Sequence, residues 1–158
     1  MTTTSYVIAL GSNRRGRHGS PEREVAAALA LLAPLAVSPI IQTPPLGPSK
    51  RRFANAVAII ETHEYPPALL RRLKAMEHQF GRRRGRAWGT RAIDLDIVLW
   101  SGGAWGDKGL TVPHPHFRTR DFVLRPLATI APGWRDPITG HTVRQLFARL
   151  TAPRRAPS

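Results

Sequence analysis

The sequence predicts an α+β fold: a ferredoxin-like βαββαβ two-layer sandwich, whose antiparallel sheet is covered by helices, with a C-terminal helical extension. Four short apolar runs of β-type composition alternate with two segments of helical periodicity in the order β-α-β-β-α-β. No repeat or linker divides the 158 residues. We therefore expect one domain over residues 1–158, with its core at about 5–150 and a frayed tail at 151–158.

The first half of the chain supplies three of the predicted elements. Ser5–Gly11 is an apolar run typical of a buried central strand. Ser20 is a suitable N-cap and Pro21 a suitable first helical residue, so a helix is predicted from there to Pro34. Val37–Thr43 is the second predicted strand, and the proline-rich segment that follows it cannot form regular structure.

The second half begins with a third predicted strand, Phe53–Glu61. Two prolines then begin a helix with one apolar stripe, formed by Leu69, Leu70, Leu73, Met76 and Phe80. The fourth strand is predicted at Ile93–Trp100 and a hairpin at Gly102–Val112. Two short helices are predicted at Phe122–Ile130 and Val143–Leu150.

Composition restricts the possible chemistry. The chain has no cysteine, which excludes disulfides, thiolate zinc sites and cysteine nucleophiles. The longest apolar stretch, near residues 25–37, is too short to cross a membrane, and the first residues lack the basic leader of a secretory signal. We expect a soluble cytoplasmic protein. Its net charge of +14 favours polyanionic partners such as nucleotides or nucleic acid.

Asp94 and Asp96 are the best candidate metal ligands. Residues i and i+2 of a strand share a face, so both carboxylates are expected on one face, with Val98 and Trp100, while Leu95 and Leu99 face the core. The pattern fits either an acidic solvent-exposed face or a magnesium site for a phosphorylated substrate.

Basic segments flank these carboxylates. Gly81–Arg91 carries five arginines and three glycines, which suits a mobile phosphate-binding lid, a solvated basic loop, or an RNA-binding patch in which Trp88 stacks on a base. His114 and His116 suggest either a zinc site or, better, contacts to a nucleotide. The Gly-Ser-Asn sequence at 11–13 is a weak phosphate-loop signal, and no Walker lysine motif is present.

Several motifs together resemble one family, the 6-hydroxymethyl-7,8-dihydropterin pyrophosphokinases of folate biosynthesis. The matching motifs are ALGSN at 9–13, TPPLGP at 43–48, FANAV at 53–57, E-x-x-x-G-R-x-R at 77–84, W-G-x-R-x-I-D-L-D-I at 88–97 and LTVPH at 110–114. They occur in the family's order, and the resemblance covers about residues 5–150. The segment at 88–97 is the most specific of them.

The resemblance implies ATP-dependent transfer of a diphosphate to the hydroxymethyl group of the pterin, with release of AMP. It implies two Mg²⁺ ions on Asp94 and Asp96, and neutralisation of the transferred group by Arg82 and Arg91. The implied ATP contacts are Glu77, Arg84, Trp88, Ile97, Thr111, His114 and Arg120. The implied pterin contacts are Thr43, Pro44, Pro45, Leu46, Phe53, Asn55 and Phe122.

The chain departs from the family pattern at a few positions. Phe53 stands where tyrosine is frequent, Thr90 where proline is frequent, and Pro115 where an aromatic residue is common; the loop around Arg84 and Arg86 is one residue shorter than in some relatives. ATP and the pterin are the expected partners of a monomer that binds no specific nucleic acid and no membrane. The alternatives are a basic RNA-binding α+β module and an unrelated magnesium-dependent nucleotide hydrolase.

Overall fold

The computed structural model describes residues 2–44, 52–81 and 92–153. Its strands are β1 (Thr4–Ser12), β2 (Ala36–Val37), β3 (Ile41–Thr43), β4 (Phe53–Thr62), β5 (Asp94–Trp100), β6 (Trp105–Asp107) and β7 (Leu110–Val112). Its helices are α1 (Pro21–Leu32), α2 (Pro66–Phe80), α3 (Asp121–Ile130) and α4 (Val143–Thr151), with a 3₁₀ turn, η1, at Phe117–Thr119. The predicted order of elements is confirmed.

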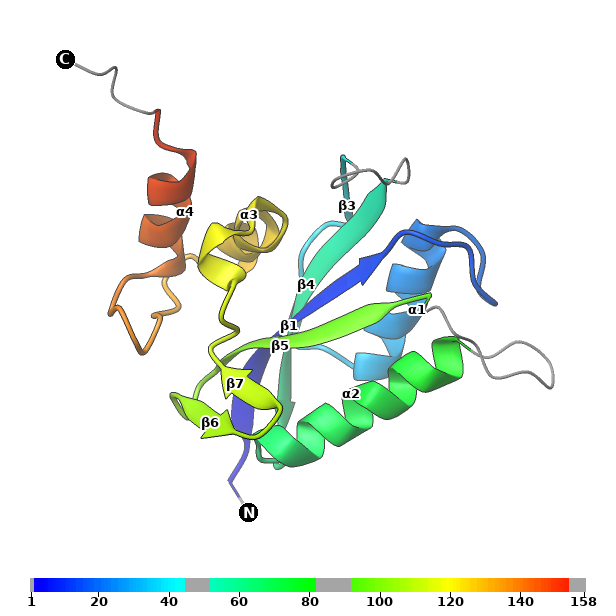
Figure 1. The fold of residues 1–158 in the computed structure, drawn as a ribbon, viewed down its shortest axis with the longest axis horizontal. Helices are drawn as coiled ribbons and strands as arrows, with labels where there is room; N and C mark the ends of the chain where they lie inside the picture. The colour runs from blue at the N-terminus through cyan, green and yellow to red at the C-terminus, as the bar shows by residue number, and fades with distance from the viewer. Residues whose placement is uncertain (1, 45–51, 82–91, 154–158) are drawn as a thin grey trace.

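The main sheet is antiparallel throughout the described residues. Its strand order is β2-β4-β1-β5, and β3 also pairs with β4. β6 and β7 form a separate hairpin, which the sequence predicted. β1 is therefore central, as its almost continuous apolar run indicated, and β5 lies at an edge (Figure 1).

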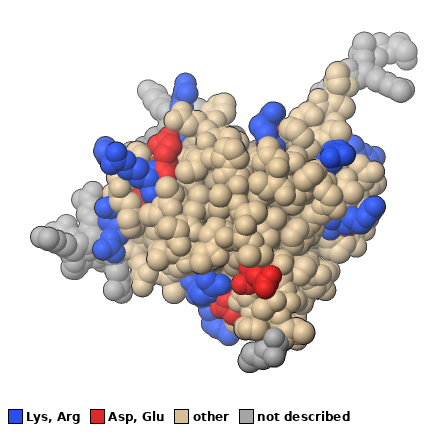
Figure 2. Space-filling view, turned by 180° about the vertical axis from the view of Figure 1, so that it is seen from behind, with Lys and Arg blue, Asp and Glu red and all other residues tan. Residues whose placement is uncertain are grey.

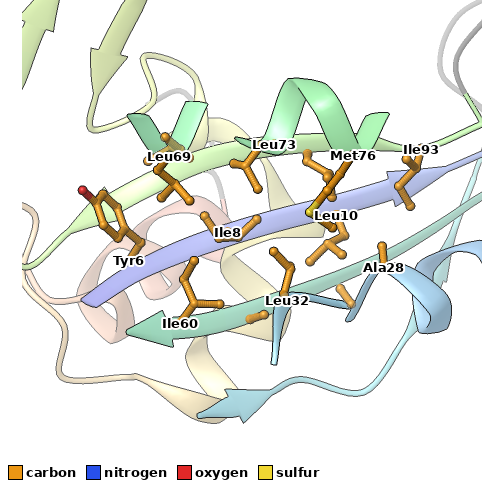
Figure 3. Packing of buried hydrophobic residues seen from close by; sticks show 14 of the residues in the cluster. Tyr6, Ile8, Leu10, Ala28, Leu32, Ile60, Leu69, Leu73, Met76 and Ile93 are labelled. Carbon is orange, nitrogen blue, oxygen red and sulfur yellow. The ribbon is translucent and has the colours of Figure 1, made fainter. Parts of the chain in front are cut away.

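One face of the sheet packs against α1 and α2. Figure 3 shows Leu69, Leu73 and Met76 of α2 directed toward Ile8 and Leu10 of β1. The prediction of a helix from Ser20 is confirmed, because the Ser20 hydroxyl accepts a hydrogen bond from the backbone N–H of Arg23 at 3.3 Å. The predicted apolar stripe of α2 faces this core.

The other face of the sheet is also covered, which the two-layer prediction did not anticipate. Val7, Val57 and Leu99 on this face pack with Leu124 and Leu127 of α3, and α4 extends the same cluster. The C-terminal helices thus lie on the side of the sheet opposite α1 and α2 (Figure 1). The reason is that the strands carry apolar residues on both faces, and both must be removed from water.

The second predicted strand is divided into β2 and β3. Pro39 lies between them and has no N–H to donate to the ladder. Ser38 compensates with two bonds to Val57: its N–H donates to the Val57 carbonyl, and its Oγ accepts from the Val57 N–H, both at 2.9 Å. The register with β4 nevertheless shifts by one residue across the interruption, since Val37 pairs with Ala58 but Ile41 pairs with Asn55.

A β-bulge in β5 changes which side chains face each side of the sheet, compared with the regular alternation that the sequence predicts. Ile97 pairs with Ile8, but Leu99 pairs with Val7, so Val98 is an extra residue in β5. Leu99 consequently joins the core on the α3 side, and Trp100 joins the core on the α2 side. The prediction that Trp100 shares the aspartate face was wrong for this reason.

Candidate active site

Asp94 and Asp96 lie at the beginning of β5, next to two very small residues of β1. In the antiparallel register Asp94 is opposite Gly11, and Asp96 is opposite Ala9. Both aspartates line a cavity on the α3 side of the sheet, while Leu95 between them packs in the core on the α2 side. Because Ala9 and Gly11 have almost no side chain, open space remains beside the carboxylates.

This space is a cavity of about 160 Å³ between the sheet and the first turn of α3. Its lining comes from segments that are far apart in the sequence and that the fold brings together, which is typical of a binding site. The functional side chains that line it are Thr43, Phe53, Asn55, Asp94, Asp96, Arg120 and Phe122.

Thr43 and Asn55 form a polar pair at the cavity. The Thr43 hydroxyl donates to Asn55 Oδ1 at 2.8 Å, and Asn55 is only 6% exposed. A Cβ at Gly11 would lie 3.0 Å from Asn55 Nδ2, so the amide nitrogen lies against β1 and would have to shift by a few tenths of an ångström if Gly11 had a side chain. The amide is therefore held in one orientation, as a group that pairs with the polar edge of a ring must be.

Two aromatic rings and a guanidinium complete the cavity. Phe53 begins β4, and Phe122 belongs to the first turn of α3; both are half-buried and line the same space. The Arg120 guanidinium carbon lies 5.7 Å from the centroid of the Phe122 ring, within cation–π range. Flat apolar faces, a cation and two carboxylates thus line a single cavity.

His114 lies beside Asp96 in a hollow that adjoins the cavity, and Asp96 and Arg120 line both spaces. The backbone N–H of His114 donates to the backbone carbonyl of Val98, the bulged residue, at 2.9 Å. Burial lowers the pKa of the His114 ring, the charges of Arg120 and His116 lower it further, and Asp96 opposes them. Since Nδ1 accepts the His116 N–H at 3.1 Å, the neutral ring carries its proton on Nε2.

The donor set determines which metal could bind. Among the described residues, no group of three or more histidine, aspartate or glutamate side chains is placed to hold an ion. Two carboxylates on a rigid strand are nevertheless a suitable partial set for Mg²⁺, which completes its octahedron with water and substrate phosphates. They do not suit a zinc site, which needs three or four protein ligands.

The structure brings most, but not all, of the predicted contacts together. Four described residues lie elsewhere. Ile97 packs in the core on the α2 side, Thr111 is exposed on β7, and Pro44 is exposed after β3. Glu77 is buried on α2, where it binds the backbone of β5. Their predicted ligand contacts remain predictions. Pro45, Leu46, Arg82, Arg84, Trp88 and Arg91 lie outside the described residues, as does most of the predicted lid.

Sequence reasoning missed the small residues that form the floor of the cavity. Ala9 and Gly11 alternate along β1 with the large residues Ile8 and Leu10, which face the opposite core. Small residues at i and i+2 of a central strand were a readable signal, since a sheet face without side chains needs a ligand or another element to fill it.

Comparison with known proteins identifies the family. The model of the family described as 7,8-dihydro-6-hydroxymethylpterin-pyrophosphokinase (HPPK) matches residues 7–132. A 2-amino-4-hydroxy-6-hydroxymethyldihydropteridine pyrophosphokinase of Pseudomonas aeruginosa is 40% identical over 148 residues, which are 89% of each chain. The protein with the same name from Synechocystis sp. is 40% identical over 104 residues, which are 66% of this chain and 53% of that relative.

A solved structure shows the same fold. The Plasmodium falciparum HPPK-DHPS wild type matches 94% of this chain with a TM-score of 0.73 at 14% identity, and the match spans 41% of that longer chain. At this identity the likeness concerns the fold alone. The family model covers most of the sequence, and the Pseudomonas aeruginosa relative is matched over nearly its whole length. The chain therefore belongs to the 7,8-dihydro-6-hydroxymethylpterin-pyrophosphokinase family.

Proposed function

We propose that this chain transfers the β,γ-diphosphate of ATP to the hydroxymethyl oxygen of 6-hydroxymethyl-7,8-dihydropterin, releasing AMP, in folate biosynthesis. The family and the names of its relatives support this activity. The observation that carries the proposal is one cavity that holds both halves of the necessary site: Asp94 and Asp96 for phosphates, and Asn55 with aromatic rings for a pterin.

The pterin end consists of Phe53, Phe122 and Asn55. A flat heterocycle gains both apolar contact and stacking energy between two phenyl rings. The ring edge carries amide-like donors and acceptors, and an amide side chain can pair with them in both directions. Because Thr43 fixes the orientation of Asn55, this pairing requires no reorganisation when the ligand binds.

The phosphate end consists of the carboxylates and nearby cations. Asp94 and Asp96 would hold Mg²⁺, for which we propose two ions; bound there, Mg²⁺ would supply positive charge that neutralises the phosphates. Arg120 adds a guanidinium to the same cavity, and neutral His114 offers Nε2–H as a donor. Arg82 and Arg91 are proposed to neutralise the transferred group.

The reaction needs alignment more than covalent help. The hydroxymethyl oxygen attacks the β-phosphorus of ATP, the bond from that phosphorus to the α–β bridging oxygen breaks, and the hydroxyl proton is released. Phe53, Phe122 and the two carboxylates line the same cavity, so a pterin held between the phenyl rings would have its hydroxymethyl oxygen close to phosphates held at the carboxylates. Fixed charges then stabilise the charge that develops on the phosphoryl group.

The strand order β2-β4-β1-β5 supports a ferredoxin-like core within one domain over residues 1–158. We propose a cytoplasmic monomer whose partners are the two small substrates. In the described ranges no helix is both long and apolar enough to cross a bilayer.

The experiment is a product analysis. ATP and Mg²⁺ are incubated with the protein, with and without 6-hydroxymethyl-7,8-dihydropterin, and the nucleotides are separated by chromatography. We expect AMP to form only when the pterin is present. Equal consumption of ATP in both samples would contradict the proposal and favour the nucleotide hydrolase.

A further inference from the structure

Glu77 of α2 has a buried carboxylate that binds the backbone of β5, the strand that carries Asp94 and Asp96. It belongs to the last turn of α2, and the residue is only 3% exposed. Its Oε2 accepts a hydrogen bond from the backbone N–H of Leu95 at 2.8 Å, and this bond is buried. Lys74 lies one turn earlier on α2, with Nζ 3.4 Å from Oε1.

Leu95 is the residue between Asp94 and Asp96, and it lies on an edge strand. In the described sheet β5 pairs with β1 alone, so alternate N–H groups of β5 point outward with no strand to receive them. Glu77 accepts the N–H of Leu95 and so takes the place of a missing neighbouring strand. The carboxylate oxygen accepts this N–H as the carbonyl of a neighbouring strand would.

A second buried bond holds the same segment from the opposite side. The Ser12 hydroxyl, at the end of β1, donates to the carbonyl of Ala92 at 2.5 Å. Ala92 lies two residues before Asp94. The backbone that carries the carboxylates is therefore fixed by Ser12 on the β1 side and by Glu77 on the α2 side.

We propose that Glu77 is a positioning residue, which acts through the Leu95 N–H to hold Asp94 and Asp96 at the spacing that a divalent cation and its nucleotide require. This role is distinct from the ATP contact that the family resemblance implies for Glu77, which stays a prediction. The proposal rests on the proposed function only for the identity of the cation and nucleotide. The physical basis of the proposal is that a displacement of about 1 Å of a ligating or catalytic group can greatly weaken binding or slow the reaction.

Three variants separate this role from others. Glu77→Met keeps the side-chain volume but removes the acceptor, whereas Glu77→Gln keeps a carbonyl oxygen that can accept from Leu95. Arg71→Met is the matched control, since Arg71 is an exposed residue of the same helix. Amide hydrogen exchange in the metal-free protein reports the bond directly, and the protection of β1 amides reports whether each variant is folded.

We expect Glu77→Met to accelerate exchange at the Leu95 amide by roughly tenfold or more, because a buried N–H loses its partner. Glu77→Gln and Arg71→Met should stay within about threefold of the parent protein. Binding of Mn²⁺ with a non-hydrolysable ATP analogue, measured by electron paramagnetic resonance, should weaken at least about fivefold in Glu77→Met and be restored in Glu77→Gln. The KM for ATP at saturating Mg²⁺ should remain unchanged.

Two results would overturn the proposal. One is unchanged Leu95 exchange in Glu77→Met. The other is an equal rise of the ATP KM in Glu77→Met and Glu77→Gln with unchanged Mn²⁺ binding, which would make Glu77 a nucleotide contact instead. If the protein forms no AMP with the pterin, the proposed function fails, but the exchange and Mn²⁺ measurements still decide the role of Glu77.

Discussion

The two aspartates differ in exposure: Asp94 is exposed, whereas Asp96 is half-buried beside His114. Neither side chain belongs to the apolar cores, so conversion to asparagine should leave the fold intact. Removing one carboxylate from a metal site should lower turnover roughly a thousandfold, since it takes away several kcal/mol of transition-state stabilisation.

The measurement for Asp96→Asn is turnover at saturating Mg²⁺, with the melting temperature as the control for folding. Near-normal turnover in a folded Asp96→Asn protein would contradict the magnesium assignment.

Thr43 offers a finer test of pterin recognition. In Thr43→Val the hydroxyl that holds Asn55 Oδ1 is lost, and the amide can rotate away from its ligand. We predict that the KM for the pterin rises about fivefold to tenfold, because the variant loses roughly the equivalent of one hydrogen bond. The KM for ATP should remain unchanged. Thr62→Val, at the far end of β4, is the matched control. Parallel changes in both Michaelis constants would indicate a general structural effect instead.

At the residue scale, the sequence predicted which side chains form the site better than it predicted which residues these side chains contact. Asp94, Asp96 and Asn55 were predicted from their residue types and from the family motifs, and all three line the cavity. The role of Glu77 could not be predicted, because a bond from a helix to the backbone of an edge strand leaves no periodic signal in either segment. Gly11 has no functional group, and it was interpreted only as the end of a predicted strand, as part of a weak phosphate-loop signal and as part of the ALGSN motif.

At the scale of elements, the loop between α3 and α4 depends on one buried ion pair. Asp136 is fully buried and accepts hydrogen bonds from Arg118 Nε at 2.5 Å and Nη2 at 2.9 Å, and from Thr139 and the Ile138 N–H. Arg118 belongs to η1, which leads to Arg120 in the cavity. The pair thereby connects the C-terminal loop to the segment that presents Arg120.

We predict that Asp136→Asn lowers the free energy of unfolding by about 2 kcal/mol at pH 7, because a charged network is broken. Burial alone would raise the pKa of Asp136, but the bonds from Arg118, Ile138 and Thr139 hold it well below its usual range. A carboxylate with a lowered pKa in the folded state stabilises the protein above its unfolded pKa of about 3.9, and this contribution is lost as the pH falls.

Urea unfolding of the parent protein and of Asp136→Asn at several pH values tests the direction of this pH dependence. The difference between the two proteins should be largest above about pH 4 and shrink below it. A difference that grows as the pH falls from 5 to 3 would contradict the assignment. Asp121→Asn is the control, since its pair with Arg125 is exposed and should matter little.

The elements themselves were largely predictable, and their exceptions have local causes. Caps and prolines predicted the start of α1, and apolar periodicity predicted α2. The bulge at Val98 was not predictable, because an extra residue in an apolar run leaves no mark in the composition. Likewise, the number of layers depended on tertiary packing, since α3 and α4 could equally have extended the α1–α2 layer.

At the scale of the whole molecule, the net charge of +14 raises the question of nucleic-acid binding. On the face that Figure 2 shows, the described basic side chains form separate groups with acidic ones among them, not one continuous stripe. The family comparison gives the RNA-binding alternative no support. We predict weak, non-specific RNA binding that falls steeply with salt concentration.

Fluorescence anisotropy with RNA oligonucleotides of several sequences, at 50 and 200 mM salt, checks this prediction. The expected result is similar, low affinities for all sequences, with a loss of roughly a hundredfold or more at the higher salt concentration. Tight binding of one sequence at physiological salt would reopen the alternative.

The most direct test of the central claim follows the β-phosphate of ATP through the reaction. ATP carrying an isotopic label at the β-phosphate is incubated with the protein, Mg²⁺ and 6-hydroxymethyl-7,8-dihydropterin, and Asp96→Asn serves as the negative control. We predict that the label leaves with the pterin as its diphosphate, while the adenine appears as AMP. Labelled ADP that forms only when the pterin is present would mean transfer of the terminal phosphate alone, and labelled ADP or labelled inorganic diphosphate that forms without the pterin would mean hydrolysis. Either result would contradict diphosphoryl transfer at the Asp94–Asp96 cavity.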